Sequence, residues 1–432
     1  MSIKELAAAA KAASIQLAGV KTSVKNKALV EIARALKNKS NEIVSANKED
    51  LISAEENNLA GPLLKRLKFD EGKIDELCAG IERLIKLDDP VGKTLSAMEL
   101  DEGLELYKVS CPIGVIGVVF ESRPDALVQI STLCLKSGNA VLLKGGSEAA
   151  RTNRILADVV AKASIKAGLP DGWIQLLEKR QDVAEMLALD ELIDLIIPRG
   201  SNEFVRYIMN NTNIAVLGHA EGICHVYVDG KADVEMAVSI AVDSKCQYVA
   251  VCNAAETLLV DEKIASVYLP KVKEALEERG VEIRGCEKTR KLIDVRPAAE
   301  KDWKTEYLDL ILSVKVVKGI NEAIEHINKY GSRHTDTIVT SDKTKACKFL
   351  ESVDSANVFW NASTRFSDGY RYGLGAEVGI STNKIHSRGP VGLEGLVIYK
   401  WKLLGSGQIV ADYSGKGGKK FRHKKLRKDC PI

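Results

Sequence analysis

The residue best suited to act in a chemical reaction is Cys252, which lies in the stretch 249–260. A run with helical spacing, residues 234–245, precedes it and a β-branched, leucine-rich run follows, so we expect the thiol at a helix-to-strand junction. Asn253 and two alanines leave room for a substrate carbonyl, and the next backbone N–H groups could face a developing oxyanion. On position alone, however, a buried and unreactive cysteine is the commoner interpretation.

A second group of residues could bind phosphate or ribose. Lys144 ends an expected strand and could reach a ribose hydroxyl or a phosphate, although a surface lysine is equally common there. Gly200-Ser201 opens an expected helix whose free N–H groups could hold a pyrophosphate, unless Ser201 is only an N-cap. The glycine-rich run 373–379 has the wrong spacing for a dinucleotide-binding turn.

Histidines provide a third group. His219, Glu221 and His225 are expected to cluster where one sheet gives way to the next, but no spacing among them demands a metal. His334 follows Arg333 in an expected loop and is better placed for a polar ligand than for a core. The residues alone therefore indicate a nucleotide-binding α/β protein with a candidate cysteine nucleophile.

The elements that must position these residues begin with helices, which we expect at 4–17, 24–37, 42–54 and 62–87, the last with a break. Leu29, Ile32, Ala33 and Leu36 form the apolar stripe of a helix packed on a larger body. An exposed alternating strand at 104–110 suggests half of a hairpin, and a similar strand at 396–402 could pair with it within or across subunits.

Short apolar strands then alternate with helices of ten or more residues. This pattern predicts parallel pairing in a doubly wound sheet, which binds ligands beyond the carboxyl ends of its strands. We expect strands at 113–120, 140–144, 173–177, 192–197, 214–217 and 225–228, and helices at 125–136 and 149–167. A second α/β unit is expected from about residue 223 to 360, with helices at 263–278, 321–330 and 343–353 and strands at 310–317, 337–340 and 356–360.

Composition and cysteine usage limit the class of protein. The chain has 45% hydrophobic and 28% charged residues, which is ordinary for a soluble globular protein, and no apolar run approaches the roughly 18–20 residues of a membrane span. The N-terminal residues lack the apolar region of a signal peptide, and the nine cysteines are scattered without a C-x-x-C pair. We therefore expect a cytoplasmic protein with reduced thiols, no membrane contact and no structural metal.

Charge is concentrated at the C-terminus. Residues 415–432 carry eight Lys or Arg and one Asp, a balance of +7. Because the net charge of the whole chain is +3, the remaining residues carry −4. A mildly acidic body argues against a nucleic-acid-binding core. The basic tail could touch phosphate or an acidic surface, but we expect it to be simply solvated.

Three motifs in order carry a family resemblance. They are Cys252-Asn253-Ala254 with Glu256-Thr257-Leu258-Leu259-Val260; the run from Val317 through Ala323, His326-Ile327, Tyr330-Gly331-Ser332, His334-Thr335-Asp336 and Ile338; and Asn361-Ala362-Ser363-Thr364-Arg365-Phe366 with Tyr372-Gly373-Leu374-Gly375-Ala376-Glu377. The chain resembles the aldehyde dehydrogenase superfamily and, within it, the branch of reductases that act on γ-glutamyl phosphate in proline biosynthesis. The resemblance as a whole covers most of the chain, from about residue 24 to 410.

The resemblance implies a three-part α/β molecule. A doubly wound cofactor domain would comprise residues 1–93 and 111–222 with a return segment near 370–395, and an α/β catalytic domain residues 223–369. Residues 94–110 and 396–413 would form a β oligomerisation hairpin and strand, followed by the basic tail at 415–432. The resemblance also implies a homo-oligomer and leaves open a transient contact with glutamate 5-kinase.

The implied reaction is the NADPH-dependent reduction of L-glutamyl 5-phosphate to the 5-semialdehyde through a Cys252 thioester. Arg123 would help to stabilise the oxyanion, and His219 occupies the place where hydrolytic members carry a glutamate base. Substrate would be bound by Arg123, His334 and Arg365. The cofactor would be bound by Lys144, Ser147, Gly200, Ser201 and Glu306, and no metal ligand is implied.

Two departures from the family pattern leave alternatives open. The family usually has Arg-Pro where this chain has Tyr248-Val249, and the tail after Gly415 lies outside the family core. One alternative is a phosphate-independent aldehyde dehydrogenase, against which the missing glutamate at His219 counts. The other is a non-catalytic relative that binds partners through its basic tail, against which the intact Cys252 and cofactor positions count.

Overall fold

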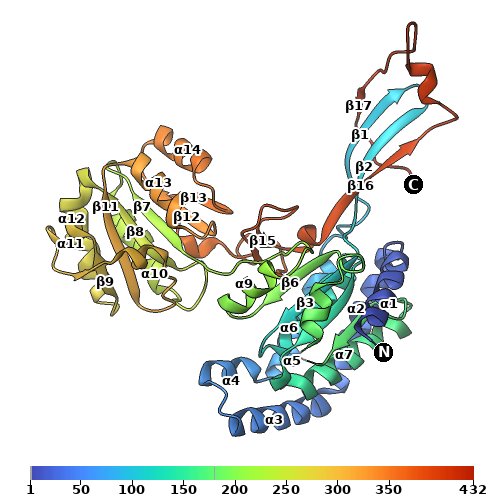
Figure 1. The fold of residues 1–432 in the computed structure, drawn as a ribbon, viewed down its shortest axis with the longest axis horizontal. Helices are drawn as coiled ribbons and strands as arrows, with labels where there is room; N and C mark the ends of the chain where they lie inside the picture. The colour runs from blue at the N-terminus through green and yellow to red at the C-terminus, as the bar shows by residue number, and fades with distance from the viewer. Residues whose placement is uncertain (1, 180) are drawn as a thin grey trace.

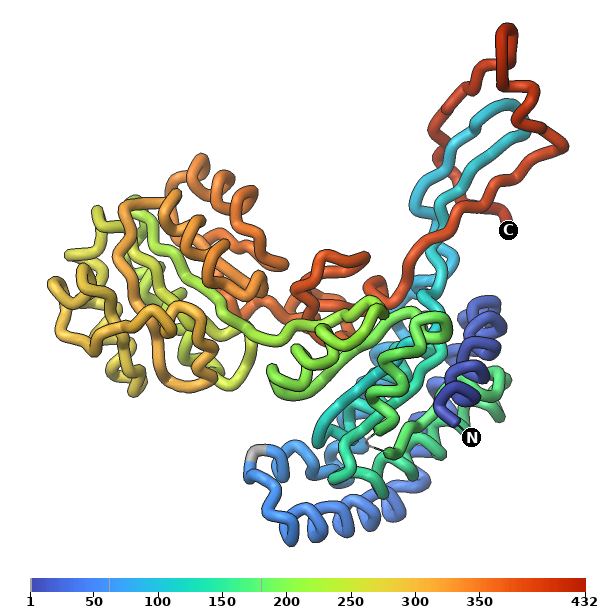
Figure 2. Tube along the Cα trace, in the orientation of Figure 1, coloured from blue at the N-terminus to red at the C-terminus, as the bar shows by residue number. Residues whose placement is uncertain are grey.

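The computed structural model describes residues 2–179 and 181–432, whose strands form three main sheets and one two-stranded sheet. Figure 1 shows two α/β units, the first at lower right and the second at left, and an antiparallel extension that projects at upper right. We call this extension the arm. The tube in Figure 2 has its N-terminus on the first unit and its C-terminus in the arm. No helix among the described residues combines the length and the apolar character needed to cross a membrane.

Five helices precede the first sheet. Leu29, Ile32 and Leu36 of the predicted apolar stripe are fully buried and join the core of the first unit. The expected break in the last helix is confirmed, because the Asp70 side chain accepts the Lys73 N–H at 3.0 Å and caps a new helix. The helices are α1 (Ile3–Leu17), α2 (Thr22–Asn38), α3 (Ser40–Glu56), α4 (Gly61–Leu67) and α5 (Glu71–Lys86).

The first unit contains a four-stranded parallel sheet of order β5-β4-β3-β6, with β3 and β4 at its centre. Its strands β3 and β4 are buried along their whole length because helices cover both faces. The elements are β3 (Val115–Phe120), α6 (Pro124–Lys136), β4 (Ala140–Gly145), η1 (Ser147–Ala149), α7 (Ala150–Lys166), β5 (Ile174–Leu177), α8 (Asp182–Leu187), β6 (Leu195–Arg199) and α9 (Asn202–Asn210).

The expected strand at 214–217 is wrong. This segment makes one parallel bridge, Ile196 to Val216, in which the Ile196 N–H donates to the Ala215 carbonyl and the Ile196 carbonyl accepts from the Leu217 N–H, both at 2.9 Å. The chain then turns away toward the second unit at Gly218, so the pairing does not extend into a strand. Two or three apolar residues in sequence cannot reveal how soon a segment leaves the sheet.

The second unit contains a seven-stranded sheet of order β10-β9-β11-β8-β7-β12-β13, and every neighbouring pair is parallel. The short strands β9 and β10, at one end of this sheet, were not among the expected strands. The strands are β7 (Cys224–Val228), β8 (Ala255–Asp261), β9 (Glu282–Gly285), β10 (Arg296–Pro297), β11 (Ile311–Val317), β12 (Thr335–Val339) and β13 (Asn357–Trp360). The helices are α10 (Val234–Cys246), α11 (Glu262–Glu277), α12 (Glu287–Arg290), η2 (Glu300–Lys304), α13 (Ile320–Tyr330), α14 (Lys343–Ser352) and η3 (Thr364–Phe366).

A return segment brings the chain back across the first unit. It contains the two-stranded sheet of β14 (Gly379–Ser381) and β15 (Gly389–Val391), followed by η4 (Leu393–Leu396). Val378, Val391 and Leu396 are buried in the core of the first unit. The two units are therefore joined by two crossings of the chain, one before β7 and one after η3.

The arm is a four-stranded antiparallel sheet of order β16-β2-β1-β17. The predicted pairing of the two exposed strands is confirmed within one chain, because β2 (Leu104–Pro112) pairs with β16 (Val397–Leu404) over eight residues. β1 (Thr94–Asp101) completes the hairpin, η5 (Val410–Tyr413) follows β16, and β17 (Lys424–Leu426) pairs with β1.

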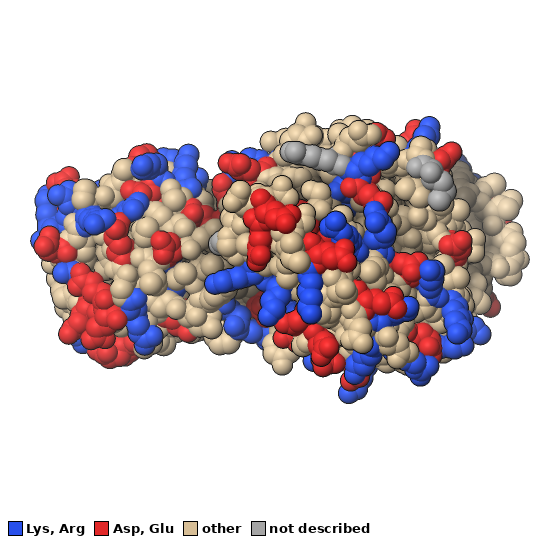
Figure 3. All heavy atoms as spheres, turned by 90° about the horizontal axis from the view of Figure 1, so that it is seen from below, with Lys and Arg blue, Asp and Glu red and all other residues tan. Residues whose placement is uncertain are grey.

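The expectation that the basic tail is simply solvated is wrong. Its residues 424–426 form β17, and Arg422 makes ion pairs with Glu99, Asp101 and Glu102. Lys428 reaches Glu105 at 2.7 Å. The acidic side chains of β1 and β2 thus neutralise part of the tail. On the face shown in Figure 3, positive and negative side chains are interspersed over both units.

Candidate active site

A cavity of about 1150 Å³ lies between the first unit, the return segment and the loop that carries Cys252. The ends of three neighbouring strands, β3, β4 and β6, form one wall. The carboxyl ends of parallel strands meet at one edge of a sheet, which explains why residues distant in sequence line one space. Residues 248 and 250–252 form part of the opposite wall.

Cys252 lies between α10 and β8, which confirms the predicted helix-to-strand junction. Two neighbours fix its backbone from behind. The Cys224 thiol donates to the Cys252 carbonyl at 3.2 Å. Gly222 packs so closely that a Cβ there would lie 2.0 Å from the same carbonyl oxygen, so only glycine fits. The loop is therefore held in one position, and the half-buried thiol lines the cavity.

The resting thiol of Cys252 is protonated at neutral pH. Burial and, to a smaller extent, the carboxylate of Glu306 together raise its pKa to about 12, and the guanidinium of Arg199 opposes this effect. A thiol must lose its proton before it can act as a nucleophile. Arg199 is therefore the side chain in this environment that favours the reactive form.

The expected cluster of His219, Glu221 and His225 does not form. His225 is fully buried and paired with Asp336, its ring Nδ1 lying 2.8 Å from the carboxylate, whereas Glu221 pairs with Arg206. These partners lie on different elements, which the spacing of the residues could not reveal. The cluster assembled instead among the described residues contains His219, Cys252 and His334, whose ligand atoms all lie within 4.8 Å of one another.

The two histidines beside Cys252 are neutral. Burial lowers the pKa of His219, and its Nδ1 lies 2.9 Å from the Ile380 carbonyl, to which it donates. Burial also holds the pKa of His334 well below its usual range. His334 is completely buried, contrary to the expectation that it lies outside the core. It precedes β12 directly, so the tight packing at the start of that strand encloses it.

Two arginines supply positive charge to the cavity. Arg123 lies at the N-terminus of α6, and its Nη2 is 3.5 Å from the Asp125 carboxylate. Arg199, at the end of β6, was missed as a site residue, although the rule that ligands bind beyond the carboxyl ends of parallel strands points to it. Burial lowers its pKa, and Gly379 leaves room for its guanidinium, because a Cβ there would lie 2.5 Å from Nη1.

The wall formed by the first sheet brings together four of the five predicted cofactor residues. Lys144, Ser147, Gly200 and Ser201 all line the cavity. Lys144 is 5% exposed, its Nζ donates to the Gly145 carbonyl, and burial lowers its pKa. The N–H of Ser201, at the start of α9, donates to the Glu121 carboxylate at 2.9 Å.

Three predicted residues lie outside the set of described residues that line the cavity: His334, Glu306 and Arg365. Glu306 is close behind the wall, since its carboxylate accepts the Gly222 N–H at 2.8 Å and the Asn202 side-chain N–H at 2.5 Å. Arg365 is 7% exposed and donates to the Gln247 side chain at 2.9 Å. Both residues therefore contact the Cys252 loop indirectly, Glu306 through Gly222 and Arg365 through Gln247.

Sequence reasoning also missed a buried ion pair beside the nucleophile. Lys245 and Glu256 are both fully buried, and the Lys245 Nζ lies 2.6 Å from the Glu256 carboxylate. The Leu308 N–H donates to the same carboxylate at 3.3 Å. The two residues bracket Cys252 in sequence, one in α10 and one in β8, so a paired charge at these ends of the loop was the available signal.

Comparison with known proteins places this architecture in a family. The sequence profile of the aldehyde dehydrogenase family matches residues 1–289. The chain belongs to the aldehyde dehydrogenase family. It is 66% identical to a gamma-glutamyl phosphate reductase of Pelotomaculum thermopropionicum, over 100% of this chain and 99% of the relative. It is thus an oxidoreductase of that family.

Solved structures agree with this assignment. The crystal structure of a gamma-glutamyl phosphate reductase from Thermotoga maritima is 42% identical, with a TM-score of 0.93 over 95% of this chain and 100% of that chain. An acetylating aldehyde dehydrogenase from Geobacillus thermoglucosidasius shares the fold at 17% identity, with a TM-score of 0.63 over 94% of this chain and 97% of that chain. The expected aldehyde dehydrogenase fold is confirmed.

Proposed function

We propose that this chain catalyses the NADPH-dependent reduction of L-glutamyl 5-phosphate to L-glutamate 5-semialdehyde and phosphate, the second step of proline biosynthesis. The observation that carries the proposal is the position of Cys252, whose thiol lines a cavity opposite the strand ends of a doubly wound sheet. The names of the relatives at 66% and 64% identity support the same substrate.

The residues of the first wall fit a dinucleotide. A buried Lys144 at the end of β4 would donate to a pyrophosphate or ribose, and Gly145, Gly146 and the N-terminal end of α9 line the same cavity. Lys65, Arg66 and Lys68 lie at the edge of the same cavity, where positive charge favours the additional 2′-phosphate of NADPH. Bound NADPH supplies the hydride that reduces the acyl group.

The chemistry of Cys252 begins with loss of its proton. The Nδ1 of His219 donates to the Ile380 carbonyl, so the other ring nitrogen carries a lone pair that can accept this proton. The Cys252 thiolate then attacks the acyl phosphate carbonyl, phosphate leaves, and a thioester remains on the enzyme. Release of the semialdehyde after reduction returns the cysteine for another turnover.

The cavity residues would bind the anionic substrate and its transition state. The Cys252 N–H and the Arg123 guanidinium are proposed to stabilise the oxyanion, at about 3–4 kcal/mol for each well-aligned donor. Arg199 is proposed to attract the acyl phosphate while it favours the thiolate. His334 and Arg365 stay predictions as substrate-binding residues. His219 occupies the place where the family resemblance puts the glutamate base of hydrolytic members, and its role here as the proton acceptor for Cys252 stays a prediction.

The arm is proposed to join copies of this chain. β16 exposes Ile398, Trp401 and Leu403, with 39, 56 and 56% of their surface accessible, and these side chains would be covered by a partner subunit. Contact with glutamate 5-kinase and a cytoplasmic location stay predictions. Sedimentation experiments test this role of the arm. Oligomers of the wild type that are lost when Trp401 is replaced would support it.

The function is tested by running the reaction backwards from glutamate 5-semialdehyde and NADP, with and without inorganic phosphate. We expect continuous NADPH formation only when phosphate is present, and no more than one NADPH per active site without it, because phosphate must cleave the thioester before the next turnover. Continuous NADPH formation without phosphate would instead indicate a hydrolytic aldehyde dehydrogenase. No signal under either condition, in a protein that binds NADP, would contradict the proposed substrate.

A further inference from the structure

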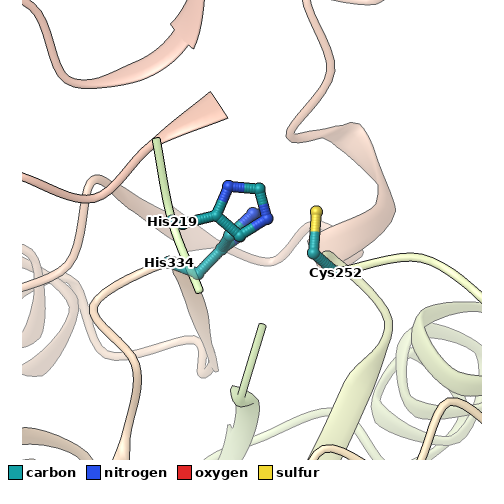
Figure 4. Close-up of side chains that lie close together, drawn as sticks. All are labelled: His219, Cys252 and His334. Carbon is teal, nitrogen blue, oxygen red and sulfur yellow. The ribbon is translucent and has the colours of Figure 1, made fainter. Parts of the chain in front are cut away.

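His219, Cys252 and His334 come from three different connections in the fold and meet at one point. His219 lies in the segment before β7, Cys252 in the loop between α10 and β8, and His334 immediately before β12. One ligand atom of each lies within 4.8 Å of the others. Figure 4 shows the two imidazoles close together on one side of a gap and the Cys252 sulfur on the other.

The hydrogen bonds of both histidines leave one ring nitrogen free. The Nδ1 of His219 lies 2.9 Å from the Ile380 carbonyl, and the Nδ1 of His334 lies 2.8 Å from the Thr335 hydroxyl. The Nε2 of His334 has no hydrogen-bond partner among the described residues although the side chain is completely buried. An unpartnered buried nitrogen costs about 1–3 kcal/mol, so this atom is suited to a ligand.

We propose that these three residues form a binding site for a divalent transition-metal cation of the Zn²⁺ type, which reversibly blocks the nucleophile. One thiolate and two imidazoles suit Zn²⁺ and Co²⁺ and leave a fourth position for water. The second nitrogen of a metal-bound histidine is commonly held by a carbonyl or hydroxyl, as both are here. On binding, the Cys252 thiol transfers its proton to solvent and forms a sulfur–metal bond, with no change of oxidation state.

The distances allow this site after a small movement. Zinc bonds of about 2.3 Å to sulfur and 2.0–2.1 Å to nitrogen place tetrahedral ligand atoms roughly 3.5 Å apart. In the structure the three ligand atoms lie within 4.8 Å of one another, and rotation of the half-buried Cys252 side chain can bring its sulfur closer to the two ring nitrogens.

Metal binding is tested with the full-length, reduced, chelator-treated protein and Co²⁺ as the probe. We expect a thiolate-to-cobalt charge-transfer band in the near ultraviolet, which Zn²⁺ abolishes by competition. The band should be absent in Cys252→Ser, and the His334→Gln change should weaken Co²⁺ binding at least ~100-fold while the circular dichroism spectrum is preserved. Cys347→Ser, which removes an exposed thiol in α14, is the matched control and should bind Co²⁺ normally.

A band of equal intensity in the wild type and in Cys252→Ser, or no band in the wild type, would overturn the site. The inhibitory role rests on the proposed function, whereas binding does not. Zn²⁺ should stop turnover, and a chelator should restore it. A protein that shows the band but no reductase activity would contradict the function alone, and an active reductase without the band would contradict the metal site alone.

Discussion

The two walls of the active-site cavity each bury a lysine, but they use it differently. Lys245, in the second unit, is fully buried and paired with Glu256 at 2.6 Å. Lys144, in the first unit, is 5% exposed, and no described carboxylate lies within ion-pairing distance of its Nζ, which donates to the Gly145 carbonyl. The Lys245 charge is neutralised within the protein, by a pair that lies on both sides of the loop that carries Cys252. We propose that the Lys144 charge instead binds the cofactor.

The largest expected effect comes from breaking the satisfied pair. Lys245→Met leaves Glu256 buried without its partner, and we expect a loss of about 3–5 kcal/mol in the free energy of unfolding. The lower end is expected because burial raises the pKa of Glu256 to about 7, so the carboxyl can be protonated. Urea denaturation measures the change. The double variant Lys245→Met/Glu256→Leu should recover most of the lost stability, and failure to recover would contradict this account.

The position of the loop that carries Cys252 also depends on Gly222. Gly222→Ala places a methyl group 2.0 Å from the Cys252 carbonyl oxygen, so the loop must shift. A displacement of about 1 Å can reduce a rate ~100-fold, and we expect a loss of this size in kcat. Gly61→Ala is the matched control, because no atom lies within 4 Å of the added methyl group. Equal activity of the two variants would show that the close approach does not position the thiol.

The unpaired lysine should respond in the opposite way to the paired one. Lys144→Met removes a buried charge without leaving a carboxylate behind, so stability should change by less than about 1 kcal/mol. Affinity for NADP should fall roughly 10–100-fold, because a charged hydrogen bond contributes about 1.5–3 kcal/mol. Fluorescence titration of NADPH measures this loss. A large loss of stability with unchanged NADPH affinity would remove the distinction between the two lysines.

A smaller effect is expected at the thiol itself. The pKa of Cys252 is about 12, so the thiolate fraction, and with it the rate of alkylation by iodoacetamide, should rise about tenfold per pH unit between pH 7 and 9. Arg199→Met removes the charge that lowers this pKa and should slow alkylation roughly 3–10-fold at pH 8. Glu306→Gln removes a charge that raises it and should accelerate alkylation. Peptide mass spectrometry at Cys252 follows the rate, and shifts in the same direction would contradict the assigned charges.

Much of the fold could be predicted because its signals are local. The spacing of apolar residues gave most helices and strands, and the same rules put Cys252 at a junction and Lys144 and Ser201 at strand ends. The short segment 214–217 and the strand 424–426 could not be predicted in this way. Whether these segments form strands depends on partners that are distant in sequence, such as the acidic residues of β1 that pair with the tail.

The composition of the site was harder to predict than its location. Arg199 and the wall residues follow from strand ends, whereas the meeting of His219, Cys252 and His334 requires contacts across more than 100 residues of chain. Surroundings also separate similar residues: His225 is buried against Asp336, whereas His334 lies beside His219 and Cys252. Residue types at a given spacing do not reveal which polar groups the core has already satisfied.

The most direct test of the central claim is to trap the acyl group on the protein. The enzyme is incubated with glutamate 5-semialdehyde and NADP without phosphate, quenched in acid, and digested for peptide mass spectrometry. We expect a glutamyl group on the Cys252 peptide, which disappears when phosphate is added before the quench and is absent in Cys252→Ala. An unmodified Cys252 in an enzyme that reduces NADP under the same conditions would contradict the thioester mechanism.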